Sequence, residues 1–216
     1  MSGKLKALVT AGLIVAALSG FAVGSLHKAS SLKPSTATEQ PGLVDIGYAQ
    51  FMGIHHEQAT LMSHIVLAHN DKRIFELANA IAINQLMEIG QLRGWLMLWH
   101  EPLLPTTERM DWLLLGKTAP DAELLKYIAD CNASSGMAGM ATTDELNELR
   151  SLDGDAQIRL YLQLMIRHHQ SGVSMAKFAA QNADSDVIRN TAAVTVMEQA
   201  QEISVMQARL HRDFAG

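Results

Sequence analysis

The stretch LMIRHHQSGVSMA, residues 164–176, decides the fold because a second version of it occurs earlier in the chain. It places His168 and His169 side by side in an apolar, helix-forming segment, with a methionine before them and another after them. A histidine in a protein core needs hydrogen-bond partners, and burial penalises its charged form. The upstream stretch FMGIHHEQATLMS, residues 51–63, contains the same unusual combination. One explanation is therefore needed for both copies.

The two stretches align without a gap, and each consists of methionine, two residues, a histidine pair, five residues and methionine. Further along, QLMEIGQL from residue 85 and QAQEISVM from residue 199 share Gln, Glu and Ile at the same spacing. The separation between the copies differs by a single residue for the two pairs of segments, which a turn can absorb. The sequence therefore predicts an internal duplication.

Each half is expected to form a helical hairpin. In the first half, a helix over about residues 44–69 ends at the turn HND, where Asp71 caps a second helix that runs to about residue 100. In the second half, Asp153 or Asp155 opens a long helix, NADSD forms the turn, and a last helix extends almost to the C-terminus. Four long helices with no sustained period-two alternation predict an all-α, antiparallel four-helix bundle.

The N-terminal region has the pattern of a targeting segment. Lys4 and Lys6 precede an uncharged apolar run, so residues 1–26 are interpreted as a signal anchor or a signal peptide. Residues 27–42 are rich in Ser, Thr, Lys and Pro and are expected to form a flexible tether. The lysines stay on the cytoplasmic side, so the remainder is expected outside the cytoplasm. It is membrane-anchored if the segment is retained, and secreted or periplasmic if it is cleaved.

The remaining residues, 43–216, are predicted to form the bundle. Its two histidine-containing halves span residues 43–101 and 152–214, and residues 102–151 form a helical, Met-rich connection. In this connection Thr143 or Asp144 is expected to cap a short helix.

Composition excludes several classes of function. The chain of 216 residues has a formal net charge of −5 and therefore no basic surface for nucleic acid. Apolar residues make up 48% but aromatic residues only 5%, so Leu, Ala, Ile and Met fill the core, as in helical proteins. Cys131 is the single cysteine, which excludes an internal disulfide and a cysteine-based zinc finger.

The repeated motif arranges soft metal donors along one helix face. Thioether sulfur suits Cu(I), imidazole suits both oxidation states of copper, and methionine does not form disulfides outside the cytoplasm. The candidate ligands are Met52, His55, His56, Met62, Met165, His168, His169 and Met175. Met137 and Met140 could add a thioether site in the glycine-containing loop. Glu88 and Glu202 could each hydrogen-bond the ring nitrogen of a histidine that does not bind the metal, and so fix the tautomer of that histidine.

The same residues also allow simpler interpretations. A methionine stripe at helical spacing fits ordinary core packing, and a buried histidine can be a hydrogen-bonded core residue. Met137 and Met140 fit any mobile loop, while Glu88 and Glu202 could pair with a basic side chain. The doubled histidine pair, each with methionine three residues before it, favours metal binding.

These motifs resemble the family known as domain of unknown function 305. The resemblance rests on the two histidine motifs, on QLMEIGQLRGWL after the first and on GMAGMAT between the halves, and it covers about residues 44–210. The family is a ferritin-like group that includes copper-binding proteins of the CopM type. The resemblance implies a ferritin-like bundle, an exported or membrane-attached location, and copper binding through Met and His. It implies the same eight ligands in the two motifs.

The leading hypothesis is a non-enzymatic, envelope-associated protein that buffers Cu(I), contributes to copper tolerance or passes copper to an envelope trafficking protein. The first alternative is a ferritin-like di-iron oxidase or iron-binding protein. Such sites use Glu-x-x-His motifs, and no Glu-x-x-His occurs in this chain. The second alternative is a metal-free anchored bundle that binds a protein partner, with histidines that respond to pH.

Overall fold

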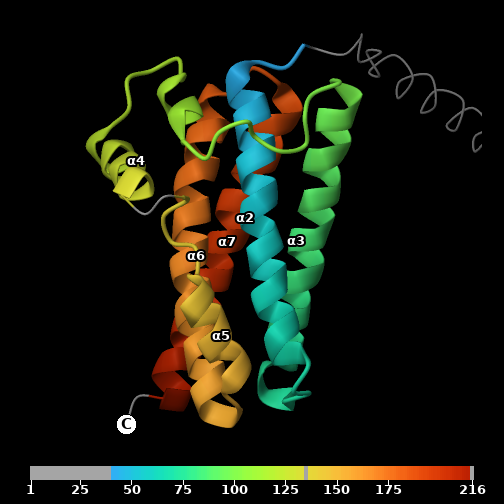
Figure 1. Ribbon diagram of the computed structural model, residues 1–216, viewed down its shortest axis with the longest axis vertical. Helices are drawn as coiled ribbons and strands as arrows, with labels where there is room; N and C mark the ends of the chain where they lie inside the picture. The colour runs from blue at the N-terminus through green and yellow to red at the C-terminus, as the bar shows by residue number, and fades with distance from the viewer. Residues whose placement is uncertain (1–39, 134–135, 215–216) are drawn as a thin grey trace, which may run out of the picture. The chain divides into compact units, whose positions relative to one another are not determined.

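The computed structural model describes residues 40–133 and 136–214, and every regular element in those residues is a helix (Figure 1). The four long helices are α2 (Leu43–Leu67), α3 (Lys72–Leu98), α6 (Gly154–Asn182) and α7 (Asp186–Phe214). The connection contains a 3₁₀ turn, η1 (Asp111–Leu114), and two shorter helices, α4 (Ala122–Ala133) and α5 (Thr143–Ser151). The predicted all-α class is confirmed for the described residues.

The predicted signal segment, residues 1–26, lies outside the described residues, as does most of the predicted tether. Among the helices of residues 40–133 and 136–214, none is long and apolar enough to cross a membrane.

The helix ends follow from local sequence. At the start of α2, the backbone N–H of Gly42 donates to the carboxylate of Asp45 at 2.6 Å, which satisfies a donor that the first turn leaves free. Between α2 and α3, Asn70 takes a positive φ of 52°, a conformation that asparagine tolerates better than most residues. Asp71 then caps α3 by accepting from the N–H of Arg73 at 2.9 Å. The predicted cap at Asp71 is confirmed.

One predicted cap is wrong by one residue. Helix α5 is capped by Thr142, and neither Thr143 nor Asp144 is the cap. The hydroxyl of Thr142 accepts from the N–H of Glu145 at 3.2 Å, and the carboxylate of Glu145 accepts from the N–H of Thr142 at 2.8 Å. This reciprocal pair requires a glutamate three residues after the cap, which selects the first of the two adjacent threonines. Of the two candidates for the start of α6, Asp153 is the N-cap residue.

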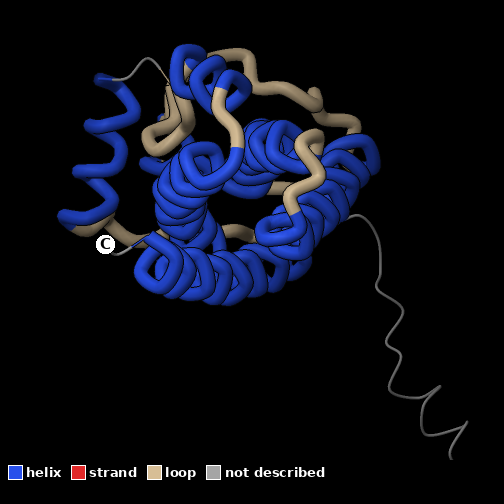
Figure 2. The backbone as a smooth tube through the Cα atoms, turned by 90° about the horizontal axis from the view of Figure 1, so that it is seen from below, coloured by secondary structure: helices blue, strands red, loops and turns tan. Residues whose placement is uncertain are grey.

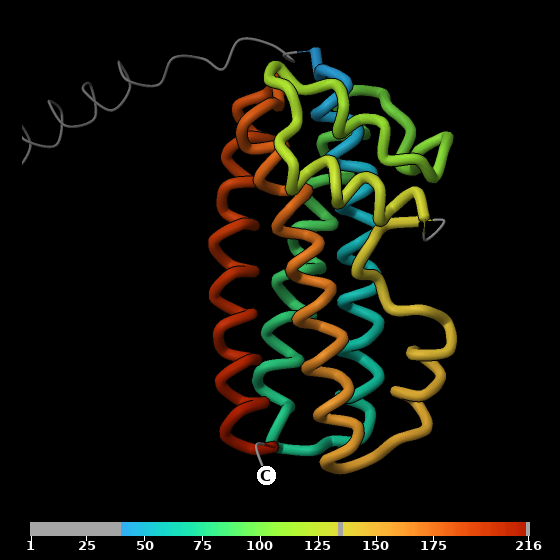
Figure 3. Tube along the Cα trace, turned by 90° about the vertical axis from the view of Figure 1, so that its left-hand side faces the viewer, coloured from blue at the N-terminus to red at the C-terminus, as the bar shows by residue number. Residues whose placement is uncertain are grey.

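The long helices form two antiparallel hairpins, α2–α3 and α6–α7, which meet through α2 and α6 (Figure 1). The end-on view in Figure 2 shows the long helices around a common centre. Helices α2 and α6 also run in opposite directions, so each half of the chain presents its motif to the other (Figure 3). Helices α3 and α7 make few contacts with one another.

The apolar core is divided into two clusters along the helix axes. The first cluster, named the Tyr48 cluster, includes the buried apolar residues of α2 up to Met52. The second, named the Tyr161 cluster, includes those of α2 from Ala59 onward. Along α6 the order is reversed, and the change of cluster falls between Ile166 and Met175. The histidine pairs occupy both boundaries. A polar layer therefore crosses the core near the middle of the helices.

Candidate metal centre

Four imidazoles from the two repeats meet in this polar layer. The side chains of His55, His56, His168 and His169 are all completely buried. The rings of His55 and His168 stack with centroids 3.6 Å apart and planes 29° from parallel. The antiparallel packing of α2 on α6 produces this arrangement, because it sets the same position of each repeat opposite its counterpart.

The outer histidine of each pair is held by a carboxylate. Nε2 of His56 lies 2.5 Å from Oε2 of Glu88 on α3, and Nε2 of His169 lies 2.6 Å from Oε2 of Glu202 on α7. Burial raises the pKa of Glu88, but the hydrogen bond and charge of His56 outweigh that effect, so the pKa is lowered overall. An ionised carboxylate can only accept, so the ring hydrogen of His56 is on Nε2. Because Nε2 faces Glu88, Nδ1 is the ring nitrogen of His56 that remains for a metal ion.

The two carboxylates differ in their other partners. The hydroxyl of Thr195 donates to Glu88 at 3.1 Å, and Tyr48 donates to Thr195 at 3.3 Å. Glu202 instead accepts from the side-chain amide of Asn84 at 3.4 Å. Both glutamates thus hydrogen-bond a histidine, although the surroundings of the two repeats have diverged. Their role as partners of metal-binding histidines stays a prediction.

Six ring nitrogens of these histidines have no hydrogen-bond partner: both nitrogens of His55 and His168, and Nδ1 of His56 and His169. Burial, followed by the charge of neighbouring histidines, lowers the pKa of His55 and His168 well below 6.5. Both are therefore neutral near pH 7, each with an unused lone pair. An unsatisfied buried polar group costs about 1–3 kcal/mol. Such a group in a core indicates a ligand, an ion or a water that completes the site.

The four methionines of the motifs are also completely buried. Met52 and Met175 belong to the Tyr48 cluster, whereas Met62 and Met165 belong to the Tyr161 cluster. Each side of the histidine layer therefore receives one methionine from each repeat. Thioethers from both halves are placed above and below the imidazoles, although these side chains also pack as ordinary core residues.

Two glutamines belong to the same layer and were not among the predicted site residues. Gln85 and Gln199 are buried, and Oε1 of Gln85 and both amide atoms of Gln199 have no partner. A Cβ on Gly172 would clash with the amide of Gln199 and would lie 3.1 Å from Cε1 of His55, so glycine makes room at this point. The signal was present in the sequence, since both glutamines stand three residues before the glutamates at equivalent places in the repeat.

Met137 and Met140 lie in a loop that packs on the helices. Met137 is half-buried against the Tyr48 cluster, and Met140 is half-buried as well. The loop is tied to α2 by Gln58, whose amide donates to the carbonyl of Ala141 at 2.9 Å. It is tied to α6 by Ser171, whose hydroxyl donates to the carbonyl of Ala138. Met137 therefore packs against the helices, and the loop covers the seam between α2 and α6. The thioether site at Met137 and Met140 stays a prediction.

In the described residues, no group of three or more His, Cys, Asp and Glu side chains is arranged in the shape that holds a metal ion. The reason is visible in the central pair: His55 and His168 lie face to face, so their nitrogens do not converge on a common point. Binding of an ion between the repeats therefore requires these two rings to turn or separate.

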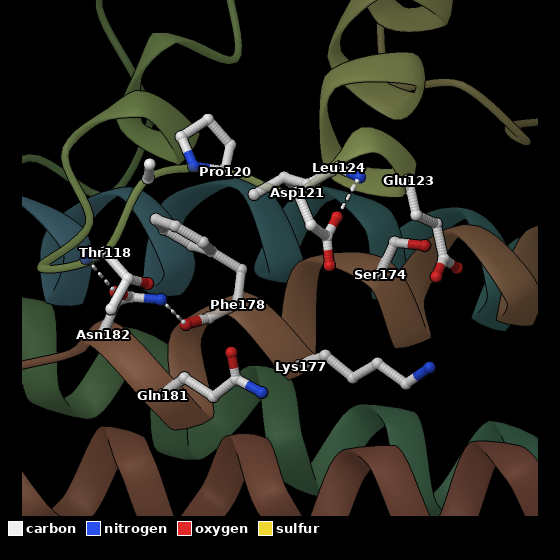
Figure 4. Close-up of a pocket in the computed structure, with 11 residues that line it drawn as sticks. Thr118, Pro120, Asp121, Glu123, Leu124, Ser174, Lys177, Phe178, Gln181 and Asn182 are labelled. Carbon is white, nitrogen blue, oxygen red and sulfur yellow. Dashed lines mark hydrogen bonds between the residues drawn. The ribbon is translucent and has the colours of Figure 1, made fainter.

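A surface pocket of about 180 Å³ lies away from this layer, between the segment before α4 and the C-terminal half of α6 (Figure 4). At its floor the side-chain oxygen of Asn182 accepts from the backbone N–H of Lys117 at 2.8 Å, which fixes the segment to the helix. None of the predicted ligands lines this pocket. Its contacts attach the connection to α6 and have no link to the histidines.

The fold and site define a class: a helical protein built from two repeated hairpins around a shared layer of histidines. The chain belongs to the family described as "Domain of unknown function (DUF305)", which matches residues 45–210.

Several solved structures are similar to it, two of them DUF305 proteins. A DUF305 protein of Streptomyces coelicolor is 34% identical, with 77% of this chain and 91% of that chain covered and a TM-score of 0.65. A DUF305 fragment from Deinococcus radiodurans is 25% identical, with 82% and 98% covered and a TM-score of 0.60. CopM in its Cu(I)-bound form is 20% identical, with 79% and 97% covered and a TM-score of 0.57, a likeness of fold alone. No curated protein matches the chain.

Proposed function

We propose that this protein is an exported, non-enzymatic copper-binding protein with a ferritin-like four-helix architecture, which buffers Cu(I) or passes it on. One observation carries the proposal: six nitrogens of four fully buried histidines have no partner. Ring nitrogens of this kind can coordinate a metal ion, and a bound ion would remove the cost of leaving them unsatisfied.

The nature of the donors favours copper. His56 and His169 are oriented from behind by Glu88 and Glu202, as metal-binding histidines usually are. Imidazole nitrogen with thioether sulfur close by is a soft donor set that suits Cu(I) better than harder ions. CopM, which shares the fold, has been solved with Cu(I) and with Cu(II).

The iron alternative is less well supported. Carboxylate-rich di-iron sites place glutamates around the metals. Here Oε2 of Glu88 and of Glu202 lies against the far nitrogen of a histidine, and both glutamates stand behind the imidazole rings. The four imidazoles and the four buried methionines outnumber these two carboxylates, which favours a soft ion.

The location outside the cytoplasm rests on the pattern of residues 1–26, with Lys4 and Lys6 before an apolar run. The Streptomyces relative is described, by inference, as a secreted protein. A retained anchor would keep the full-length chain in the membrane fraction after a carbonate wash. An envelope protein that exchanges copper is the partner that this location implies.

The deciding experiment offers copper and iron separately to purified protein, measures bound metal, and then titrates Cu(I) against a competing chelator. The double variant His55→Leu/His168→Leu is expected to lower Cu(I) affinity by at least about tenfold, equivalent to roughly 1.4 kcal/mol. The matched control is His64→Leu, an exposed histidine on the same helix as His55. Retention of iron but not copper would favour the iron alternative, and failure to bind either metal would favour a metal-free interaction protein.

A further inference from the structure

The histidine layer is connected to the surface through a groove between α3 and α7. The groove encloses about 320 Å³. Its walls consist of four residues from each helix: Asn84, Met87, Glu88 and Gln91 from α3, and Asn190, Thr191, Val194 and Glu198 from α7. It lies where the helical domain is least tightly closed, because α3 and α7 make few contacts with one another.

Glu88 links this groove directly to the buried imidazoles. It lines the groove, its side chain is 13% exposed, and its Oε2 lies 2.5 Å from Nε2 of His56. His56 is fully buried, and its other ring nitrogen has no partner. On the neighbouring turn, Asn84 lines the groove and donates to Glu202, the partner of His169. His56 is therefore separated from the groove by one side chain, and His169 by two.

The groove carries groups that attract and bind a copper cation. Glu198 shares a hydrogen bond with Glu88, so two carboxyl groups lie together in the wall. Met87 also lines the groove, and its side chain is 61% exposed, which places a thioether where an ion arriving from solvent can bind it. Acidic walls in a partly desolvated groove concentrate cations and raise their rate of association.

The opposite side of the layer is covered. The loop at residues 136–141 lies over the α2–α6 seam, held by Gln58 on α2 and by Ser171 and Arg167 on α6. Helices α2 and α3 pack along their length, as do α6 and α7. An ion that approached from those sides would have to displace packed side chains or the loop.

We propose that the groove between α3 and α7 is the route by which a copper cation reaches and leaves the histidine layer, with Met87 and Glu198 at its mouth and Glu88 at its inner end. This inference rests on the proposed copper function. The groove then affects the rates at which copper enters and leaves, and it takes no part in the final coordination of the ion. A block in the route must therefore slow loading and release by the same factor, because a change in the path alone leaves the equilibrium constant unchanged.

The test compares Val194→Trp, which fills the groove, with Val205→Trp, a substitution of a similarly exposed valine on the same helix outside it. The full-length protein is mixed anaerobically with Cu(I) supplied as its acetonitrile complex, and loading is followed by the ultraviolet copper–ligand absorbance. Val194→Trp is expected to slow loading and chelator-driven release by about tenfold each, within the range by which access alters association. Val205→Trp is expected to match the wild type.

A second pair isolates the charge. Glu198→Lys puts a positive charge in the groove wall and is expected to slow loading several-fold at low salt, with the difference shrinking as salt screens that charge. Glu76→Lys, at an exposed glutamate on α3 outside the groove, should have no such effect. Unchanged loading and release in Val194→Trp, with copper affinity intact, would overturn the route while leaving the proposed function standing. A larger dissociation constant in Val194→Trp without slower release would show that the groove is part of the binding site. That result would also overturn the proposed route. Failure of the wild type to bind copper would refute the proposed function itself.

Discussion

His55 and His168 lie stacked in the centre of the helical domain, and none of their four ring nitrogens has a hydrogen-bond partner. His56 and His169, one position along, each bond a glutamate through one nitrogen. Adjacent residues of the same type therefore contribute differently to stability. The inner pair destabilises the metal-free protein, whereas each outer histidine also satisfies a carboxylate.

Single substitutions are expected to separate the two kinds of histidine. His168→Leu removes two unsatisfied nitrogens at similar volume, and it should leave the metal-free protein as stable as the wild type or more stable by about 1 kcal/mol. His169→Leu deprives Glu202 of its partner and should destabilise by about 1–2 kcal/mol. Chemical denaturation in the presence of a chelator measures both. A loss of stability in His168→Leu equal to that in His169→Leu would contradict the assignment.

The inner histidines also predict how stability depends on pH. Their pKa values are lowered in the folded state relative to 6.5, so the unfolded chain binds more protons at acidic pH. The free-energy cost of burying them is therefore smallest above pH 6.5 and grows as the pH falls below it. With two such groups, the free energy of unfolding of the metal-free protein should fall by up to about 2.7 kcal/mol per pH unit.

Denaturation at intervals between pH 7 and pH 5 measures this slope. In His168→Leu one of the two groups is gone, so about half of the slope should remain. A flat profile in the wild type would show that the inner rings are protonated in the folded protein or that solvent reaches them.

At the scale of single elements, the ends of the helices are specified by short-range chemistry. Asp71 caps α3, Asp45 accepts from the N–H of Gly42 at the start of α2, and Thr142 and Glu145 form a reciprocal pair at α5. The faces of the helices are specified less locally. α2 and α6 contribute to both apolar clusters, and the histidine pairs mark the change from one cluster to the other.

Adjacent threonines provide a test of the cap at α5. Thr142→Ala removes the side chain that accepts from the N–H of Glu145, and it should destabilise the protein by about 1 kcal/mol. Thr143→Ala changes an exposed residue in the first turn and should be close to neutral. Thermal unfolding of the two variants side by side gives the comparison. Equal effects would mean that the cap at Thr142 contributes little.

At the scale of the molecule, the two repeats form one centre between them. Each supplies one inner histidine, one outer histidine, one glutamate and one glutamine to the same layer, and each side of the layer has one methionine from each repeat. Neither hairpin can form this layer alone. The halves have nevertheless diverged at the second partners of Glu88 and Glu202, and their surface outlets meet in a single groove.

Removal of residues 1–39 is expected to leave this unit intact. All the described helices lie between residues 43 and 214, and a chain that starts at Gln40 keeps the hydrogen bond between Gly42 and Asp45. The shortened protein should show a helical circular dichroism spectrum, unfold within a few degrees of the full-length chain and bind the same amount of copper per molecule. A spectrum dominated by strand or disorder would contradict this.

The sequence by itself determined the helical class, the duplication, the cap at Asp71 and the eight Met and His candidates, because periodicity, turn chemistry and repeated spacing are properties of neighbouring residues. It also suggested Glu88 and Glu202, since they recur at equivalent positions. Only the tertiary structure decided which residues meet. The stacking of His55 on His168, the unsatisfied glutamines and the outlet beside Glu88 depend on the antiparallel packing of α2 on α6 and on the loose contact of α3 with α7. These are contacts between residues far apart in the chain, and no local pattern specifies them.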